Sequence, residues 1–264
     1  MAANSRLNAS KLGMVASCIA LCTCGAYVIG HTQDDGPLVF GPKEDRSKPQ
    51  RIPKNSAIKV LFGGKQAGLD ANWQNRGAAK PAWIVSRDGF LEVKPGSGDI
   101  GTKEKFQDFQ LHIEFKVPYM PEGKGQGRGN SGVFLQSRYE IQLLDSYGFK
   151  SPGMGDCGAV YNKSAPLVNA CKEPLQWQTY DITFRTARRD SSGKVVENVR
   201  VSVIQNGIVV QNNTEIVGVC GAAEDNAEGT PGRIRLQDHG NKMQFRNIWI
   251  LPLPEQGNKD YSPH

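Results

Sequence analysis

A strict alternation of apolar and polar residues constrains the fold of this chain more than any other feature. The segment Phe109-Gln-Leu-His-Ile-Glu-Phe-Lys-Val117 places every apolar residue at an odd position and every polar residue at an even one. Successive side chains of a strand point to opposite faces of its sheet, so we predict a strand with one face in a core. We interpret the other face, which carries His112 and Glu114, as solvated.

Short apolar runs recur along the chain, separated by turn residues. They cover residues 83–86, 90–93, 133–136, 139–144, 180–186, 199–205, 233–237 and 245–251. Asn206-Gly207 follows one of these runs and is typical of a type I′ hairpin turn. Because no helical period exceeds about two turns, the pattern predicts an all-β fold, a two-sheet antiparallel sandwich of jelly-roll type.

The N-terminal region is predicted to direct export. Arg6 and Lys11 precede an uncharged apolar run that ends near residue 30, the arrangement of a secretory signal or a signal anchor. The run is about long enough to span a bilayer. The segment could therefore be a signal peptide that is cleaved or an anchor that is retained in the membrane. We therefore expect a periplasmic or extracellular protein, or one held at the membrane by this segment alone.

The rest of the chain divides by composition. Residues 31–54 are rich in proline and mixed charges and are predicted to be a linker. Residues 55–254 carry the strand pattern and form the expected folded domain, and residues 255–264 form a polar, loose tail. The net charge of +6 is scattered, without a basic stripe interleaved with aromatic residues, so no nucleic-acid partner is expected.

The six cysteines fall into two groups. Three lie in the N-terminal segment, and Cys157, Cys171 and Cys220 lie in the domain. In an oxidising compartment Cys157 and Cys171 could form a disulfide that closes a short loop, worth about 3 kcal/mol, with Cys220 left free. No cysteine or histidine cluster has the spacing of a structural zinc site.

Candidate site residues lie first on the predicted strand over residues 139–144. Glu140 and Gln142 share one face of this strand, and Asp145 falls on the opposite face if the strand is regular. The doublet Leu143-Leu144 breaks the alternation, and a β-bulge there would bring Asp145 back beside Glu140. The alternative is a half-solvated strand with an exposed acid and amide.

A second polar group lies near the C-terminus. Arg235, Gln237 and His239 alternate onto one face. Amides and ionisable groups on a sheet suit a sugar, whose hydroxyls both donate and accept hydrogen bonds, and histidine exchanges protons near neutral pH. We therefore expect a carbohydrate partner; an ordinary surface histidine is the alternative.

The glycine pattern Gly127-x-Gly129-x-x-Gly132 precedes a predicted strand instead of opening a helix. A dinucleotide-binding loop is therefore rejected. We interpret the segment as a loop that borders the site, with Asn130 and Ser131 as further substrate-binding candidates.

Several of these stretches together resemble the 3-keto-disaccharide hydrolase family. They are Gly129-Asn-Ser-Gly-Val-Phe-Leu135, Tyr139-Glu-Ile-Gln-Leu-Leu-Asp-Ser-Tyr-Gly148, Arg235-Leu-Gln-Asp-His-Gly-Asn241 and Phe245-Arg-Asn-Ile-Trp249. The resemblance covers nearly the whole predicted domain. It implies a concanavalin-like jelly roll with its site on the concave sheet, and cleavage of glycosides already oxidised at C3 of the sugar.

The chemistry of such a substrate suggests roles for the candidate residues. A 3-keto group acidifies the C2 proton, so a base can remove it, the anomeric oxygen can leave, and water can then add. Glu140 is the candidate base and His239 the candidate donor, while Gln142, Arg235 and Gln237 would position hydroxyls and polarise the ketone. Asp145 would orient His239 or act as a second acid or base, and a divalent metal as the electrophile stays open.

Two other functions stay open. Glu140-x-Gln-x-x-Asp145 is similar to the Glu-x-Asp-x-x-Glu strand of laminarinase-like retaining glycosidases, which use two carboxylates about 5–5.5 Å apart. An amide in the middle and the shorter last acid weaken that mechanism. The other alternative is a non-catalytic carbohydrate-binding module.

Overall fold

The computed structural model describes residues 47–77 and 79–256 of the chain. The predicted signal or anchor over residues 1–30, most of the predicted linker and most of the predicted tail lie outside these residues. In the described ranges no helix is both long and apolar enough to cross a membrane.

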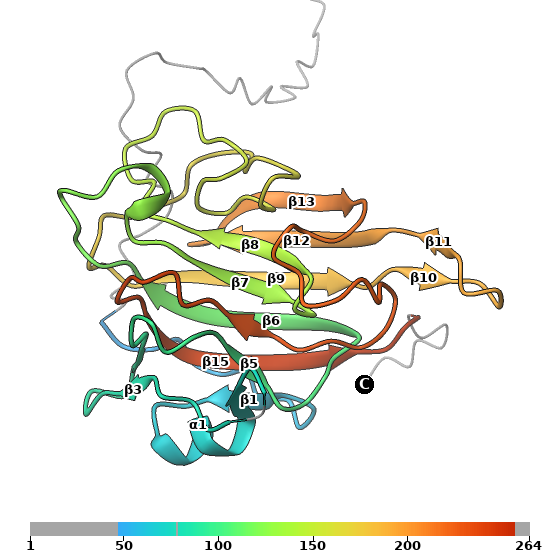
Figure 1. Ribbon diagram of the computed structural model, residues 1–264, viewed down its shortest axis with the longest axis horizontal. Helices are drawn as coiled ribbons and strands as arrows, with labels where there is room; N and C mark the ends of the chain where they lie inside the picture. The colour runs from blue at the N-terminus through green and yellow to red at the C-terminus, as the bar shows by residue number, and fades with distance from the viewer. Residues whose placement is uncertain (1–46, 78, 257–264) are drawn as a thin grey trace, which may run out of the picture. The chain divides into compact units, whose positions relative to one another are not determined.

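Two antiparallel sheets lie one over the other (Figure 1). Sheet A runs in the order β13 (Ile208–Ile216), β12 (Val199–Gln205), β9 (Gln178–Arg185), β6 (Asp108–Lys116), β15 (Gln244–Leu253), β4 (Leu91–Glu92) and β3 (Ile84–Val85), and β1 (Lys59–Phe62) also pairs with β15. Sheet B runs in the order β2 (Trp73–Asn75), β5 (Ile100–Thr102), β14 (Arg235–Leu236), β7 (Ser131–Leu135) and β8 (Tyr139–Leu143). The predicted all-β jelly-roll sandwich is confirmed.

Three small elements complete the described chain. They are the helix α1 (Gln66–Asn72), the 3-10 turn η1 (Gly125–Gly127) and the hairpin of β10 (Arg188–Arg189) with β11 (Val195–Glu197). The hairpin extends beyond one end of the sandwich (Figure 1).

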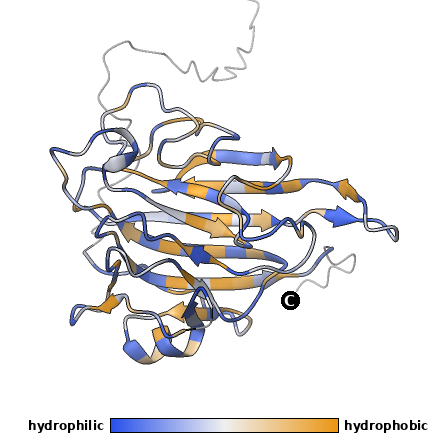
Figure 2. Ribbon diagram, in the orientation of Figure 1, coloured by the Kyte–Doolittle hydropathy of each residue, from blue (hydrophilic) through white to orange (hydrophobic). Residues whose placement is uncertain are grey.

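The core lies between the two sheets, where the period-two pattern directs the apolar side chains. Phe109, Ile113 and Phe115 of β6 are fully buried in it, and apolar and polar positions alternate along the strands (Figure 2). At Asn206 and Gly207, between β12 and β13, φ is 54° and 86°. Both values lie in the left-handed region that a type I′ turn requires, so the predicted hairpin is confirmed.

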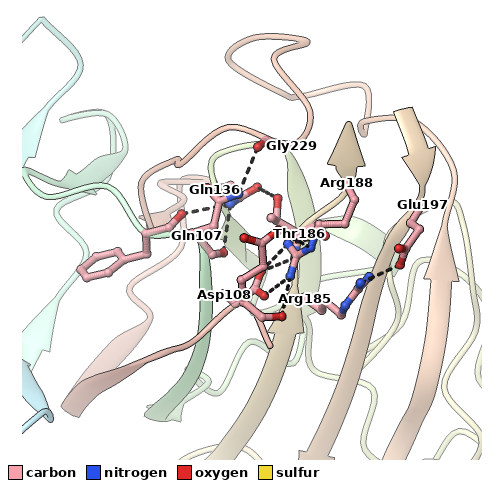
Figure 3. A network of polar contacts seen from close by, with 10 residues as sticks. Gln107, Asp108, Gln136, Arg185, Thr186, Arg188, Glu197 and Gly229 are labelled. Atoms are coloured by element: carbon pink, nitrogen blue, oxygen red, sulfur yellow. Dashed lines mark hydrogen bonds and ion pairs between the residues drawn. The ribbon is translucent and has the colours of Figure 1, made fainter. Parts of the chain in front are cut away.

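A buried polar network joins the two sheets at one end of their strands (Figure 3). Gln136, which follows β7 of sheet B, accepts a 2.9 Å hydrogen bond at Oε1 from the hydroxyl of Thr186, which follows β9 of sheet A. The Thr186 amide in turn donates to Asp108 of β6 at 2.9 Å, and Asp108 pairs with Arg188. A side chain cannot fit at Gly232, because an added Cβ would stand 2.5 Å from Cβ of Gln136.

His112 and Glu114, on the outer face of sheet A, are buried instead of solvated, which corrects our prediction. The ring of His112 stacks on that of Trp249, and Glu114 is contacted by residues 47–50, which we call the N-terminal strap. The Gln50 amide of the strap donates to Oε1 of Glu114 at 2.6 Å, and Arg246 of β15 donates to the Ser47 carbonyl at 2.8 Å. The end of the predicted linker thus packs on sheet A.

Glu114 is the centre of this contact. Asn247 donates to Oε1 at 2.8 Å and Arg246 pairs with Oε2 at 2.7 Å. Burial by itself raises the pKa of Glu114, but hydrogen bonds from His112, the Gln50 amide, Asn247 and Arg246 outweigh burial and hold the pKa at about 2. The strap is therefore fastened by an ionised carboxylate.

Candidate active site on sheet B

The hairpin of β7 and β8 turns two polar side chains outward. Gln136 and Ser137 have φ values of 55° and 57°, and the Arg138 amide donates to the Leu135 carbonyl at 3.1 Å. The strands therefore meet in a tight turn at Gln136 and Ser137. With the apolar residues of β8 in the core, Glu140 and Gln142 lie on the outer face of sheet B.

The register of sheet B brings one outward residue of each strand into a single row. Gln74 pairs with Gly101, Gly101 with Arg235, Arg235 with Phe134 and Phe134 with Glu140. Phe134 is buried on this outer face because the Arg235 guanidinium lies 3.6 Å above its ring, a cation–π contact. Arg235 thus reaches the middle of the row.

The carboxyl group of Glu140 lies over Gly132, the next outward-facing position of β7 after Phe134. A Cβ on Gly132 would stand 3.0 Å from Cδ of Glu140, so the glycine provides the space that the acid occupies. The Gln142 amide, in the orientation that satisfies its neighbours, donates to Oε1 of Glu140 at 3.2 Å. On the β14 side of β7, the main-chain N–H of Gln237 donates to the Gly132 carbonyl at 3.1 Å.

Glu140 is only 4% exposed. Burial raises the pKa of Glu140 to about 7; the nearby charge of Arg235 lowers it in part, and that of Asp99 raises it further. A carboxyl group with this pKa is divided between acid and base at neutral pH, which suits proton transfer. The side-chain Oε1 of Gln237 is buried without a hydrogen-bond partner among the described residues.

Arg235 is held by two acids and one carbonyl. Its Nη1 lies 2.7 Å from Asp99, its Nε lies 3.9 Å from Glu224, and its Nη2 donates to the Ala222 carbonyl at 2.6 Å. Nε is buried and makes no hydrogen bond within the described part of the chain. Arg235 is therefore a fixed positive charge whose Nε–H has no partner among the described residues.

The segment that contains Ala222 also reaches Glu140. The Cys220 amide donates to the Arg138 carbonyl at 2.9 Å. Burial raises the pKa of the Cys220 thiol, and the Glu140 charge adds to this effect while Arg235 opposes it. Cys220, which was predicted to be free, thus lies buried near Glu140 and Arg235.

The amide side chains form a second group next to Glu140. The Gln142 amide lies 2.8 Å from that of Gln126 and 3.3 Å from that of Asn130. Asn130 also donates to the Gln126 carbonyl at 2.7 Å, and Ser131 donates to the Gln237 carbonyl at 2.7 Å. The structure thus gathers five of the predicted substrate-binding residues, Gln142, Arg235, Gln237, Asn130 and Ser131, around β7 and its neighbours.

Asp145 is not brought to Glu140, in contrast to the predicted bulge. Leu143 and Leu144 are both buried, as the broken alternation indicates, but β8 ends at Leu143. The Asp145 amide then donates to the Arg128 carbonyl at 3.2 Å, and its carboxylate pairs with the Arg128 guanidinium at 3.1 Å. The strand ends there because the chain pairs with a loop residue instead of continuing along β7.

His239 lies three residues beyond β14 and is exposed. The turn that carries it is fixed by the Asp238 amide, which donates to Asp99 at 2.8 Å. Among the described residues His239 makes no hydrogen bond or ion pair with Glu140 or Asp145. The predicted imidazole therefore stands at the rim of the site.

Next to Arg235 the outer face of sheet B has a hollow of about 410 Å³. Its walls carry charged and amide groups, including Gln74, Arg76, Asp99, Glu224 and Arg233. This volume falls in the range of small-molecule sites. The hollow begins at the arginine that borders Glu140.

Cys157 and Cys171 are neighbours but do not form the predicted disulfide. Cys157 Sγ lies 3.2 Å from the Tyr180 hydroxyl, and the Cys171 thiol faces the Leu144 carbonyl at 3.6 Å. Each sulfur thus has its own polar partner in the core. In the described ranges no three His, Cys, Asp or Glu side chains are grouped so that they could hold a metal ion.

Sequence reasoning missed Asp99, Gly132, Phe134 and Cys220. Phe134 was noted only as part of the apolar run over residues 133–136, and its pairing with Glu140 places it on the outer face. Asp99 lies next to the three-residue strand β5, which is too short to show a period. Gly132 was recorded only as the end of a glycine pattern, but glycine within a strand often marks close approach of another group.

A family model for the 3-keto-alpha-glucoside-1,2-lyase-like domain matches residues 57–251. The chain belongs to this family. The resemblance to 3-keto-disaccharide hydrolases is thereby confirmed, and the match spans every strand from β1 to β14 and most of β15. No curated protein matches the chain.

Solved structures of two proteins from Parabacteroides distasonis ATCC 8503, both named as candidate glycosyl hydrolases, are similar to this family member. One is 36% identical, covers 83% of this chain and 100% of its own, and superposes with a TM-score of 0.67. The other is 22% identical, covers 75% of this chain and 94% of its own, with a TM-score of 0.55, and supports the fold alone. The chain therefore shares its domain with glycosyl-hydrolase-type proteins.

Proposed function

We propose that the protein cleaves the glycosidic bond of 3-keto-glycosides, with Glu140 as the base that removes the C2 proton. The observation that carries the proposal is the state of Glu140. Its carboxyl group is buried over Gly132, and its pKa is raised to about 7. The family match and the glycosyl-hydrolase names of similar structures support a carbohydrate substrate.

The proposed reaction is an elimination followed by a hydration. Glu140 takes the proton from C2, which the adjacent C3 ketone makes acidic, and the electron pair forms the enolate. The enolate then expels the oxygen at C1, which leaves a double bond between C1 and C2. Water adds across this bond, with hydroxyl at C1 and hydrogen at C2, to release the 3-keto sugar.

The enolate oxygen needs positive charge, and Arg235 is the residue to supply it. Its guanidinium is fixed by Asp99 at 2.7 Å, and its Nε has no hydrogen-bond partner among the described residues. A donor that is oriented before the reaction stabilises a developing negative charge without reorganisation. Gln237 and Gln142 flank Glu140 and would bind sugar hydroxyls.

His239 is proposed to return a proton to the leaving group. It is exposed at the rim, so it would act on an oxygen that leaves toward solvent. A metal ion in place of Arg235 as the electrophile stays open, and treatment with a chelator followed by readdition of divalent ions tests it.

The deciding experiment compares 3-keto disaccharides with the same disaccharides before oxidation. We expect cleavage of the keto forms only, and at least about 10²-fold slower turnover in Glu140→Gln, as for the loss of acid–base catalysis. Equal rates on both substrate forms would instead indicate a retaining glycosidase. Sugar binding without any product from keto-glycosides would indicate a binding module.

A further inference from the structure

We propose that the hollow beside Arg235 is the subsite for the leaving group, and that it selects leaving groups that carry a carboxylate. The inference rests on the proposed function for the position of the reacting sugar. The charge and shape of the hollow are taken from the structure alone.

The row across sheet B sets the geometry. Glu140 stands on β8, Arg235 on β14 and Gln74 on β2, so four strand spacings of about 4.8 Å separate the acid from the far wall. A sugar ring with C2 at Glu140 and C1 directed along the row toward β14 covers about half of this distance. Its C1 substituent can then extend over Gly101, which has no side chain, into the hollow.

The charges in the hollow do not balance. The Arg235 charge is matched by Asp99 at 2.7 Å and by Glu224 at 3.9 Å. Arg233 also lines the hollow, but its guanidinium donates to the backbone carbonyls of Thr102 and Lys103. In the described part of the chain Arg233 has no carboxylate partner.

Arg76 adds a second unmatched charge. It lines the hollow, is exposed, and forms no ion pair with any described residue. A guanidinium group presents parallel N–H donors that match the two oxygens of a carboxylate. Three arginines and two acids line the hollow, so it carries a net charge of +1, which one carboxylate of a ligand would neutralise.

An unpartnered polar atom gives independent support for a ligand. The buried Oδ1 of Asn75, a residue that lines the hollow, has no hydrogen-bond partner among the described atoms. Buried polar groups are normally paired, so this atom indicates a polar ligand that supplies a donor.

Binding of unoxidised glycosides tests the subsite without the proposed chemistry. The probes are 4-carboxyphenyl and 4-carbamoylphenyl α-D-glucoside, which differ in one negative charge, titrated into the full chain by calorimetry. We expect the carboxylate to bind about fivefold more tightly in low salt, and we expect 0.5 M salt to remove most of this preference, because salt screens exposed charges.

Arg76→Gln should reduce the preference roughly two- to fivefold, the range for one exposed ion pair, whereas Arg233→Lys should retain it. The matched control is Arg200→Gln, which removes one positive charge from β12 of sheet A, where Arg200 pairs with Glu215. Equal affinity for both probes, no binding of the carboxylate probe, or an unchanged preference in Arg76→Gln would overturn the proposal.

The 3-keto forms of the same two glucosides separate this inference from the proposed function. Cleavage of both with equal kcat/KM, together with equal binding of the unoxidised forms, would reject the subsite and keep the chemistry. A carboxylate preference in binding without cleavage of either keto form would keep the subsite and reject the chemistry.

Discussion

The carboxyl group of Glu140 occupies the space where a side chain of Gly132 would otherwise be. An added Cβ at Gly132 would lie 3.0 Å from Cδ of Glu140 and 2.8 Å from the ring of Phe134, both closer than real side chains approach. Glu140 is therefore positioned by the absence of a neighbour as much as by its hydrogen bonds.

Gly132→Ala should displace the Glu140 carboxyl group and lower kcat on 3-keto-glycosides by about 10²-fold, the effect of misplacing a reacting group by about 1 Å. The matched control is Gly68→Ala in α1, where the nearest atom to an added Cβ is 3.9 Å away and activity should be unchanged. Melting curves of both variants check the fold. Normal kcat in Gly132→Ala would contradict the proposed position of the base.

The pH dependence of the wild type follows from the raised pKa of Glu140. The base must be ionised, so kcat/KM should fall about tenfold per pH unit below an inflection near pH 7. An inflection near 4.5, the ordinary value of a glutamate, would show that burial does not raise the pKa of Glu140 in the free enzyme.

Stability should depend on pH through the same group. The folded-state pKa of Glu140 is raised from 4.5 to about 7, so its favourable contribution is complete below pH 4.5 and is lost as pH rises through 7. Glu140→Gln cannot ionise. We expect it to unfold less readily than the wild type at pH 8, by up to about 3 kcal/mol, with little difference at pH 4.5; urea unfolding at both pH values measures this.

His239→Ala should slow substrates with poor leaving groups more than substrates with good ones. An alkoxide needs a proton as it departs, whereas a nitrophenolate does not, so the loss should be at least about 10²-fold for a keto-disaccharide and severalfold for a keto-nitrophenyl glycoside. Asp145→Asn, which alters the pair with Arg128, is the comparison. Equal losses on both substrates would argue against a donor role for His239.

Glu114→Gln should loosen the N-terminal strap. The change removes the charge that holds Arg246 and weakens the acceptor for the Gln50 amide, at a cost on the order of 3 kcal/mol. Hydrogen exchange of the peptide that contains residues 47–53 should accelerate, while Glu215→Gln, which disrupts an exposed pair with Arg200, should leave it unchanged. Protection that survives in Glu114→Gln would show that other contacts hold the strap.

The same carboxylate predicts an acid limit. The pKa of Glu114 is lowered from 4.5 to about 2, so its stabilisation is complete above pH 4.5 and is lost as pH falls toward 2. In wild-type protein, the protection factor of the strap amides, which is the intrinsic exchange rate at each pH divided by the measured rate, should therefore fall over this interval. An unchanged protection factor would contradict the role of the ionised group.

Local pattern predicted the parts of the fold in which contacts are close in sequence. The long alternation of β6, the Asn206-Gly207 hairpin and the β7–β8 hairpin each contain their own signal. The strands β2 and β5 have three residues each, which is too few for a period to emerge. Their places in sheet B depend on partners far away in the chain.

The site shows the same limit. Glu140, Gln142 and Arg235 could be chosen because their own strands turn them outward. The contact between Arg235 and Asp99 joins residues 136 positions apart, and the cover of Glu114 by Gln50 joins residues 64 positions apart. Neither contact leaves a trace in the local sequence, and for that reason the buried face of β6 was mistaken for a solvated one.

The strap and the candidate active site lie on opposite outer faces of the sandwich. Residues 47–50 pack on the outer face of sheet A, whereas Glu140 and the hollow lie on the outer face of sheet B. A change in the strap can therefore influence the site only through the core that separates the two sheets.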